Sequence, residues 1–325
     1  MLYAYCQSAE GLRAVAGLDL AAQQKSLVWV DLCEPTAEEQ GMVNHLFSTD
    51  IPTREEMAEI ELSSRLYQEN SAVYATATLV TKADTEAPES NVVTFVLSGD
   101  CLITVRYTDP QPFRNFVNRA ERSNNGITNG AAVGAGLLEA IVDRMADILE
   151  RVAQDLDQVA RVVFRSPLLR NSDQSLDFAA LLQRIGNSGD VVSKARESFV
   201  SISRVLSFLA QSSFYRVGSE DQTRLHTLLR DVAALSDHAT FLANKVNFLL
   251  DATLGMISIE QNKIIKIFSV AAVVFLPPTL VASIYGMNFH AMPELNLVFG
   301  YPLALLFMVL SAYMPYKFFK RKGWL

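Results

Sequence analysis

The stretch IFSVAAVVFLPPTLVASIYGMNF, residues 267–289, contains 23 residues and no charged side chain. As an α-helix it would span about 35 Å, long enough to cross a hydrocarbon core about 30 Å thick. A second uncharged stretch, LNLVFGYPLALLFMVLSAYMPY, covers residues 295–316. Buried helices of a soluble core are seldom both this long and free of charge. The two stretches therefore predict two transmembrane helices at the C-terminal end of the chain.

Basic residues lie just outside both apolar stretches. Lys263 and Lys266 precede the first stretch, and the second is followed by Lys317, Lys320, Arg321 and Lys322. The connection at 285–297 contains neither Lys nor Arg. By the positive-inside rule both termini face the cytosol, and the short connection faces outward.

A third long helix is predicted ahead of the first apolar stretch and continuous with it. From about residue 221 the chain has no proline before Pro277, and only Gly255 interrupts it. A helix of some sixty residues would be about 90 Å long. Since a globular domain cannot bury such a helix, we expect it to project as a stalk whose last third is the first membrane segment.

The first 220 residues predict an α+β domain. The apolar run 27–32 suits a buried strand, and the runs 92–97 and 101–107 flank Ser98-Gly99-Asp100 as a β-hairpin. Two T-x-x-E capping boxes, Thr36 with Glu39 and Thr53 with Glu56, open short helices.

Two longer helices complete this domain, one beginning near residue 134 and one over about 178–211, and we expect them to pair as an antiparallel hairpin. The predicted boundaries follow. They are a cytosolic domain at 1–220, a stalk helix at 221–266, membrane helices at 267–289 and 297–317, a periplasmic loop at 290–296, and a basic tail at 318–325.

Polar side chains of the first membrane helix share one helical face. Alternating steps of three and four residues from Asn262 reach Ile265, Ser269, Ala272, Leu276, Thr279, Ser283 and Gly286, and the same stepping backward reaches Asp251. Such a seam drifts only about 20° per heptad. It could line a pore with hydroxyl groups, one amide and an inner ring of carboxylates. Small hydroxyls at this spacing also serve helix packing, and the stripe alone leaves both interpretations open.

The two apolar helices limit how ions could cross. Two helices cannot enclose a water path, so a pore would need several copies of the chain around a symmetry axis. Neither stretch contains an acidic residue. A lining of neutral oxygens suits the passage of a hydrated cation better than a proton-coupled carrier, which would need a buried carboxylate.

Several classes of function are disfavoured by composition. The 28 Lys+Arg against 35 Asp+Glu leave a net charge of −7, whereas nucleic-acid binding needs basic patches. No G-x-x-x-x-G-K-[ST] motif occurs, and the four histidines are scattered with no catalytic constellation around them. We therefore expect no enzyme, no organic cofactor, and neither nucleotide nor nucleic acid as a partner.

The run Tyr285-Gly286-Met287-Asn288-Phe289, followed by Met292-Pro293-Glu294-Leu295, resembles the signature of the CorA family of magnesium transporters, bacterial type. The resemblance extends from about residue 244 to the basic C-terminal end, and the order of elements fits the whole chain more loosely. It implies a funnel-shaped homopentamer in the bacterial inner membrane. In that assembly the first membrane helix lines a channel for Mg²⁺ uptake.

The resemblance also implies roles for particular residues. The outer selectivity mouth would be Tyr285, Gly286, Met287, Asn288, Phe289 and Glu294, with Asn288 presenting its carbonyl to hydrated Mg²⁺. The pore lining would include Asp251, Asn262, Ile265, Phe268, Leu276 and Thr279, the apolar members acting as a gate. Ser269, Ala272 and Ser283 complete the candidate lining because they lie on the same stripe. A basic collar at the inner mouth would be Lys263, Lys266, Lys320, Arg321 and Lys322. Asp84 and Asp231 are candidate ligands for a regulatory Mg²⁺ that closes the channel.

The sequence is also compatible with other functions. His290 stands where the family often has an acidic residue, so the mouth would attract cations less strongly and could favour Co²⁺ or Ni²⁺. Transport of Zn²⁺ is a further alternative. A membrane-anchored metal sensor without a pore is the alternative of another class, although a simple anchor needs no polar stripe.

Overall fold

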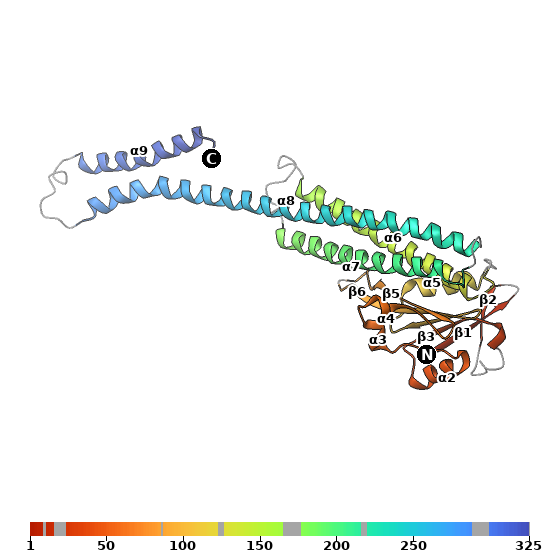
Figure 1. Ribbon diagram of the computed structural model, residues 1–325. Helices are drawn as coiled ribbons and strands as arrows, with labels where there is room; N and C mark the ends of the chain where they lie inside the picture. The colour runs from red at the N-terminus through yellow and green to blue at the C-terminus, as the bar shows by residue number, and fades with distance from the viewer. Residues whose placement is uncertain are drawn as a thin grey trace. The chain divides into compact units, whose positions relative to one another are not determined.

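The computed structural model describes residues 1–8, 11–15, 24–85, 87–122, 127–164, 177–215, 220–287 and 299–324. The chain divides into two compact units, Met1–Leu250 and Asp251–Leu325. Figure 1 shows the strands gathered in the first unit and helices alone in the second. This order confirms the predicted α/β domain followed by long helices and two C-terminal apolar helices.

One mixed sheet organises the first unit. Within the described residues its strands have the order β2-β1-β3-β7-β6-β5-β4. Every neighbouring pair is antiparallel except β3 with β7, which is parallel. The strands are β1 (Leu2–Ser8), β2 (Gly11–Ala14), β3 (Leu27–Cys33), β4 (Leu66–Glu69), β5 (Ala72–Thr81), β6 (Glu89–Ser98) and β7 (Cys101–Arg106).

The local signals in the sequence form as predicted. Ser98 pairs with Cys101 across a two-residue turn in which Gly99 has φ +56°, a conformation that glycine adopts without steric cost. Thr36 and Glu39 make both bonds of a capping box at the start of α2 (Ala37–Phe47). Thr53 and Glu56 do the same for α3 (Arg54–Ala58).

Helices cover both faces of the sheet. The remaining ones in this unit are the 3₁₀ turn η1 (Gln24–Ser26), α4 (Leu62–Arg65), α5 (Gln111–Ala120), α6 (Gly130–Val163) and α7 (Phe178–Gln211). On β3, Val30 and Leu32 join Val43 of α2 and Met57 of α3 in one core cluster. Trp29, which directly precedes Val30 and so faces the other side of the sheet, packs against the rings of Phe113 and Phe116. Both faces are therefore apolar, and β5 and β7 are buried along their whole length.

The helical part of the first unit follows the periodicity of the sequence. Helix α7 has the predicted bounds, whereas α6 begins four residues before the predicted start, with Asn129 as its N-cap. Helix α8 (Glu220–Tyr285) has 66 residues and is about 100 Å long. It begins at the predicted place and runs without a break from the first unit into the second.

The start of α6 lies directly on the backbone of β7. The Gly130 amide donates a 2.6 Å hydrogen bond to the Asp100 carbonyl. A Cβ at Gly130 would lie 2.3 Å from the Leu102 nitrogen and 2.5 Å from the Cys101 carbonyl carbon. Since backbone atoms cannot rotate away, Gly130→Ala is expected to lower the free energy of unfolding by about 1–3 kcal/mol or more. Thermal unfolding followed by the fluorescence of buried Trp29 measures the loss.

Gly186→Ala on α7 is the matched control. No atom lies within 4 Å of its Cβ position, so alanine should instead stabilise the helix by about 0.5–1 kcal/mol. Equal unfolding temperatures for the two variants would show that the α6–β7 contact is looser than these distances indicate.

Candidate functional site

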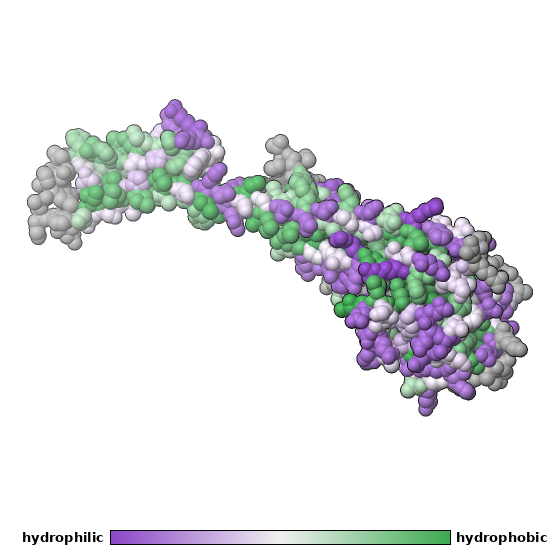
Figure 2. All heavy atoms as spheres, in the orientation of Figure 1, coloured by the Kyte–Doolittle hydropathy of each residue, from purple (hydrophilic) through white to green (hydrophobic). Residues whose placement is uncertain are grey.

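Two helices in the described part of the chain are long and apolar enough to cross a bilayer: α8, in its C-terminal part, and α9 (Gly300–Arg321). Their most apolar windows are only 6% and 0% buried, whereas an apolar helix of a soluble core is covered by other elements. Figure 2 shows apolar side chains gathered over these helices and a hydrophilic cluster at the end of α9. Such an extended apolar surface is typical of helices that lie in lipid.

The predicted polar stripe occupies the face of α8 that α9 leaves open. Between residues 260 and 285 the buried or half-buried positions are Val270, Ala271, Val274, Pro277, Pro278 and Val281. With about 3.6 residues per turn, this packed face points away from the stripe. All nine predicted lining residues are exposed: Asp251, Asn262, Ile265, Phe268, Ser269, Ala272, Leu276, Thr279 and Ser283. The polar face is therefore free to meet water or other copies of the chain.

The double proline lies inside α8 without ending it. Because proline has no amide hydrogen, the carbonyls of Val273 and Val274 lose their usual helical partners. Thr279 follows directly, and its hydroxyl donates a 2.8 Å hydrogen bond to the Phe275 carbonyl. The Oγ1 lone pairs of Thr279 stay available as acceptors on the exposed face.

The predicted mouth is only partly described. Helix α8 ends at Tyr285, and the amides of Gly286 and Met287 still donate to the carbonyls of Ala282 and Ile284, at 2.9 and 3.3 Å. Tyr285, Gly286 and Met287 are exposed. The other mouth residues, Asn288, Phe289 and Glu294, lie outside the described residues, as does His290.

The start of the first apolar stretch meets the end of the second. The Lys266 ammonium nitrogen lies 5.9 Å from the centroid of the Trp324 ring, so α8 and α9 run antiparallel. Both sets of basic residues therefore lie at one end of the helix pair, as the positive-inside rule requires. Lys263 and Arg321 are exposed at this same end.

Aromatic rings lie close to several of these lysines, and these contacts were not predicted from the sequence. Lys317 lies 5.7 Å from the ring of Tyr313, and Lys320 lies 5.8 Å from that of Tyr316. Lys322 lies 5.0 Å from the ring of Phe318. Each pair is separated by four residues, which places both side chains on one side of a helix. This four-residue spacing is visible in the sequence and could have predicted the contacts between lysines and rings.

The two candidate regulatory carboxylates lie in different surroundings. Asp84 accepts a 2.6 Å hydrogen bond from Arg144 and a second, short one from Arg151. Its charge is therefore already matched by two guanidinium groups of α6.

Asp231 belongs to an acidic surface shared by α6 and α8. Burial raises the pKa of the neighbouring Asp143 above its ordinary value, and the charges of Glu139, Asp147 and Asp231 raise it further, against the opposing effect of Arg119. Mutual repulsion of this kind favours a bound cation. Among the described residues of one chain, however, no group of three or more His, Cys, Asp or Glu could hold a metal ion.

Comparison with known proteins gives one consistent result. Residues 24–321 match the family described as CorA-like Mg²⁺ transporter protein. The chain is 36% identical over 304 residues to the magnesium transport protein CorA of Pasteurella multocida (strain Pm70), covering 94% of each chain. It is 37% identical over 298 residues to that of Escherichia coli (strain K12), covering 92% of each.

The fold also matches a solved structure along its whole length. The complete structure of the CorA magnesium transporter from Methanocaldococcus jannaschii superposes with a TM-score of 0.75, covering 100% of this chain and 99% of that one. The sequence identity is 16%, so this likeness concerns the fold.

Proposed function

Because the chain belongs to the CorA family of Mg²⁺ transporters, we propose that it forms a channel through which the membrane potential drives Mg²⁺ into the cytosol. It is a homologue of magnesium transport proteins and a membrane protein, and its family is one of transporters rather than enzymes. The observation that carries the proposal is the polar stripe on the face of α8 that α9 does not cover. A membrane anchor has no use for such a face.

The proposed assembly is a funnel-shaped homopentamer. A pore needs copies of α8 around an axis, since the described part of one chain supplies two membrane helices. The stripe from Asn262 to Ser283 would then face the axis, and α9 would lie outside against lipid. Residues 221–266 would form the stalk and 267–289 the pore helix, followed by a periplasmic loop at 290–296.

The proposed ion path starts at the outer mouth. The hydrated ion would be received by Tyr285, Gly286, Met287, Asn288, Phe289 and Glu294, and the Asn288 carbonyl would make the first selective contact. Hydroxyl and amide oxygens would then accompany the ion past the apolar gate at Leu276, Phe268 and Ile265. The lysines and Arg321 would surround the inner mouth of a channel in the bacterial inner membrane, with both termini cytosolic.

Regulation by cytosolic Mg²⁺ is part of the proposal. Asp231 has the stronger support as a ligand, because it lies among the carboxylates that raise the pKa of Asp143. Asp84 could bind a metal only by leaving Arg144 and Arg151. Since one chain offers no complete metal group among its described residues, the regulatory ion would bind between subunits.

Uptake into proteoliposomes tests the function. Purified protein is incorporated into vesicles that contain a Mg²⁺-sensitive dye and Mg²⁺-free buffer, and an inside-negative potential is applied. Two positive charges gain about 4.6 kcal/mol per 100 mV on crossing, so the flux should follow the potential. Protein-free vesicles and vesicles without a potential are the controls. No flux from well-incorporated protein would refute a Mg²⁺ channel and make Co²⁺, Ni²⁺ and Zn²⁺ the next ions to measure.

A further inference from the structure

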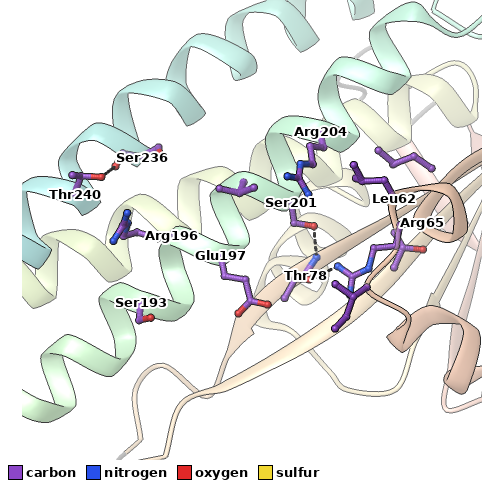
Figure 3. Close-up of a pocket in the computed structure, with 14 residues that line it drawn as sticks. Leu62, Arg65, Thr78, Ser193, Arg196, Glu197, Ser201, Arg204, Ser236 and Thr240 are labelled. Atoms are coloured by element: carbon purple, nitrogen blue, oxygen red, sulfur yellow. Dashed lines mark hydrogen bonds between the residues drawn. The ribbon is translucent and has the colours of Figure 1, made fainter.

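A second candidate site lies wholly within the first unit. A pocket of about 530 Å³ opens where α7 passes over β5, with α4 and α8 at its sides (Figure 3). Its charged lining residues are Arg65, Arg196, Arg204 and Glu197. Three guanidinium groups accompany one carboxylate, so the pocket has a net positive charge in a chain whose net charge is −7.

Two of these arginines have no partner in the part of the chain that the structure describes. Arg196 and Arg204 are exposed on α7, and neither makes an ion pair or a hydrogen bond to another described residue. The other cations of the same helix are paired: Arg184 with Asp155, and Lys194 with Asp190. The unpaired cations of α7 are therefore concentrated at the pocket.

The third arginine is already fixed in place. The Arg65 Nε donates to the Glu59 carbonyl at 2.5 Å, and its Nη1 donates to the Thr78 hydroxyl at 3.1 Å. A guanidinium group has five N–H donors, so the remaining three can bind a ligand. Figure 3 shows Arg65 reaching toward Thr78 opposite the stretch of α7 that carries Arg196, Glu197 and Arg204.

The spacing along α7 selects an anion with several charged groups. Arg196 and Arg204 are eight residues apart on the side of the helix that lines the pocket, so their backbones are separated by about 12 Å. Arginine side chains are long enough to converge on a chain of linked phosphates, whereas one phosphate ion is too small to contact all three guanidinium groups. Guanidinium groups bind phosphate oxygens in a bidentate manner, which favours phosphate over a simple counter-ion.

Glu197, the one carboxylate that lines the pocket, could bind the Mg²⁺ ion that accompanies a polyphosphate. Glu197 directly follows Arg196 and lies about one turn before Ser201, whose hydroxyl accepts a 2.9 Å hydrogen bond from the Thr78 amide. This bond joins α7 to β5 and fixes the wall that carries Glu197. Proteins hold Mg²⁺ through one or two carboxylates together with phosphate oxygens, so Glu197 could share a Mg²⁺ ion with a bound polyphosphate.

An apolar wall completes the pocket. Ile60, Leu62 and Val200 line it and are 89%, 49% and 47% exposed, which is high for large apolar side chains. Exposed apolar groups next to arginines could cover the flat face of a base, if the phosphates are carried by a nucleoside.

We propose that this pocket binds a polyphosphate together with its Mg²⁺, either free or carried by a nucleoside. The sequence contains no P-loop, and the expectation of no nucleotide partner rested on that absence. In this pocket the guanidinium groups of three arginines would bind the phosphates, as the backbone amides of a glycine-rich loop do in a P-loop. A site of this kind would bring a cytosolic Mg²⁺ complex to the domain that precedes the membrane helices, and it is separate from the proposed conduction path.

Calorimetric titration of the purified full chain in detergent tests the proposal. The probes are ATP and tripolyphosphate, each with and without a fixed concentration of free Mg²⁺, and Mg²⁺ alone is the blank. We expect binding that weakens at least about tenfold in the double variant Arg196→Ala/Arg204→Ala, because charge-assisted hydrogen bonds are lost. Equal affinities for the two probes would mean that the pocket contacts the phosphates alone. Tighter binding of ATP would mean that the pocket also contacts the nucleoside.

The variant Glu197→Gln tests the role of the cation. It should reduce the gain in affinity that Mg²⁺ confers on either probe, because an amide is a weaker ligand for Mg²⁺ than a carboxylate. An undiminished gain would overturn the assignment of Mg²⁺ to Glu197.

Arg230→Ala is the matched control, since Arg230 is an exposed arginine of α8 outside the pocket lining. Exposed substitutions of this kind seldom affect folding, and circular dichroism verifies that each variant is folded. Absence of binding by both probes, or an equal loss in the Arg230→Ala variant, would overturn the proposal. The readout does not depend on ion flux, so its failure is distinct from failure of the proposed channel.

Discussion

Replacing Asn288 with leucine is expected to abolish selective Mg²⁺ uptake, with a fall in flux of at least about tenfold. Leucine has the same number of side-chain heavy atoms as asparagine and the same branching at Cγ, but no oxygen to offer the hydrated ion. In an oligomer around one axis, the substitution removes the same carbonyl from every subunit at once, so the whole selective ring is lost. The proteoliposome assay with an internal Mg²⁺ dye measures the effect directly.

Asn187→Leu provides the control for this change. Asn187 is exposed on α7 in the first unit, so the same chemical substitution there should leave the flux unchanged. A membrane-anchored sensor without a pore would behave differently, because its function would survive the Asn288 variant. Undiminished flux in Asn288→Leu would remove this residue from the selectivity mouth.

Local signals in the sequence predicted much of the fold. The capping boxes at Thr36 and Thr53, the turn at Gly99 and the long helix from residue 220 each depend on neighbours within a few positions. Such patterns are visible in sequence because propensity, capping and hydrophobic period act over one or two turns.

Contacts between distant residues were not visible in the same way. Asp84 was a candidate metal ligand because it is a carboxylate, but its arginine partners lie 60 and 67 residues further along the chain. The pocket arginines likewise come from separate elements, α4 and α7. Periodicity places a residue on one face of its own helix, and only tertiary packing decides what that face meets.

The candidate pore stripe falls between these two cases. Stepping along α8 placed its members on one face, and the structure adds that these members are exposed while buried and half-buried residues lie on the opposite face. In the proposed oligomer the exposed stripe would meet other copies of the chain, and no pattern within one chain encodes that contact.

A buried ion pair joins the two parallel strands of the sheet. Arg106 of β7 donates from Nη2 to the Asp31 Oδ2 at 2.9 Å, and its Nε lies 3.1 Å from both carboxylate oxygens. The side chains are only 7% and 4% exposed. The Thr104 hydroxyl donates to Asp31 at 2.7 Å and accepts from the Trp29 indole at 3.0 Å. Asp31 therefore completes a network in which every member has a partner.

Asp31→Ala is expected to lower the free energy of unfolding by about 3–5 kcal/mol, because it leaves the Arg106 guanidinium buried beside a cavity with its main counter-charge gone. For a unit of this size that corresponds to a fall in unfolding temperature of about 10 °C, measurable by Trp fluorescence of the full chain in detergent.

Asp109→Ala is the control, because it removes the other carboxylate that contacts Arg106, at 2.9 Å, but Asp109 is 47% exposed. Water can replace an exposed partner, so the free energy of unfolding of that variant should fall by at most about 1 kcal/mol. Equal losses in the two variants would mean that burial does not set the strength of this pair.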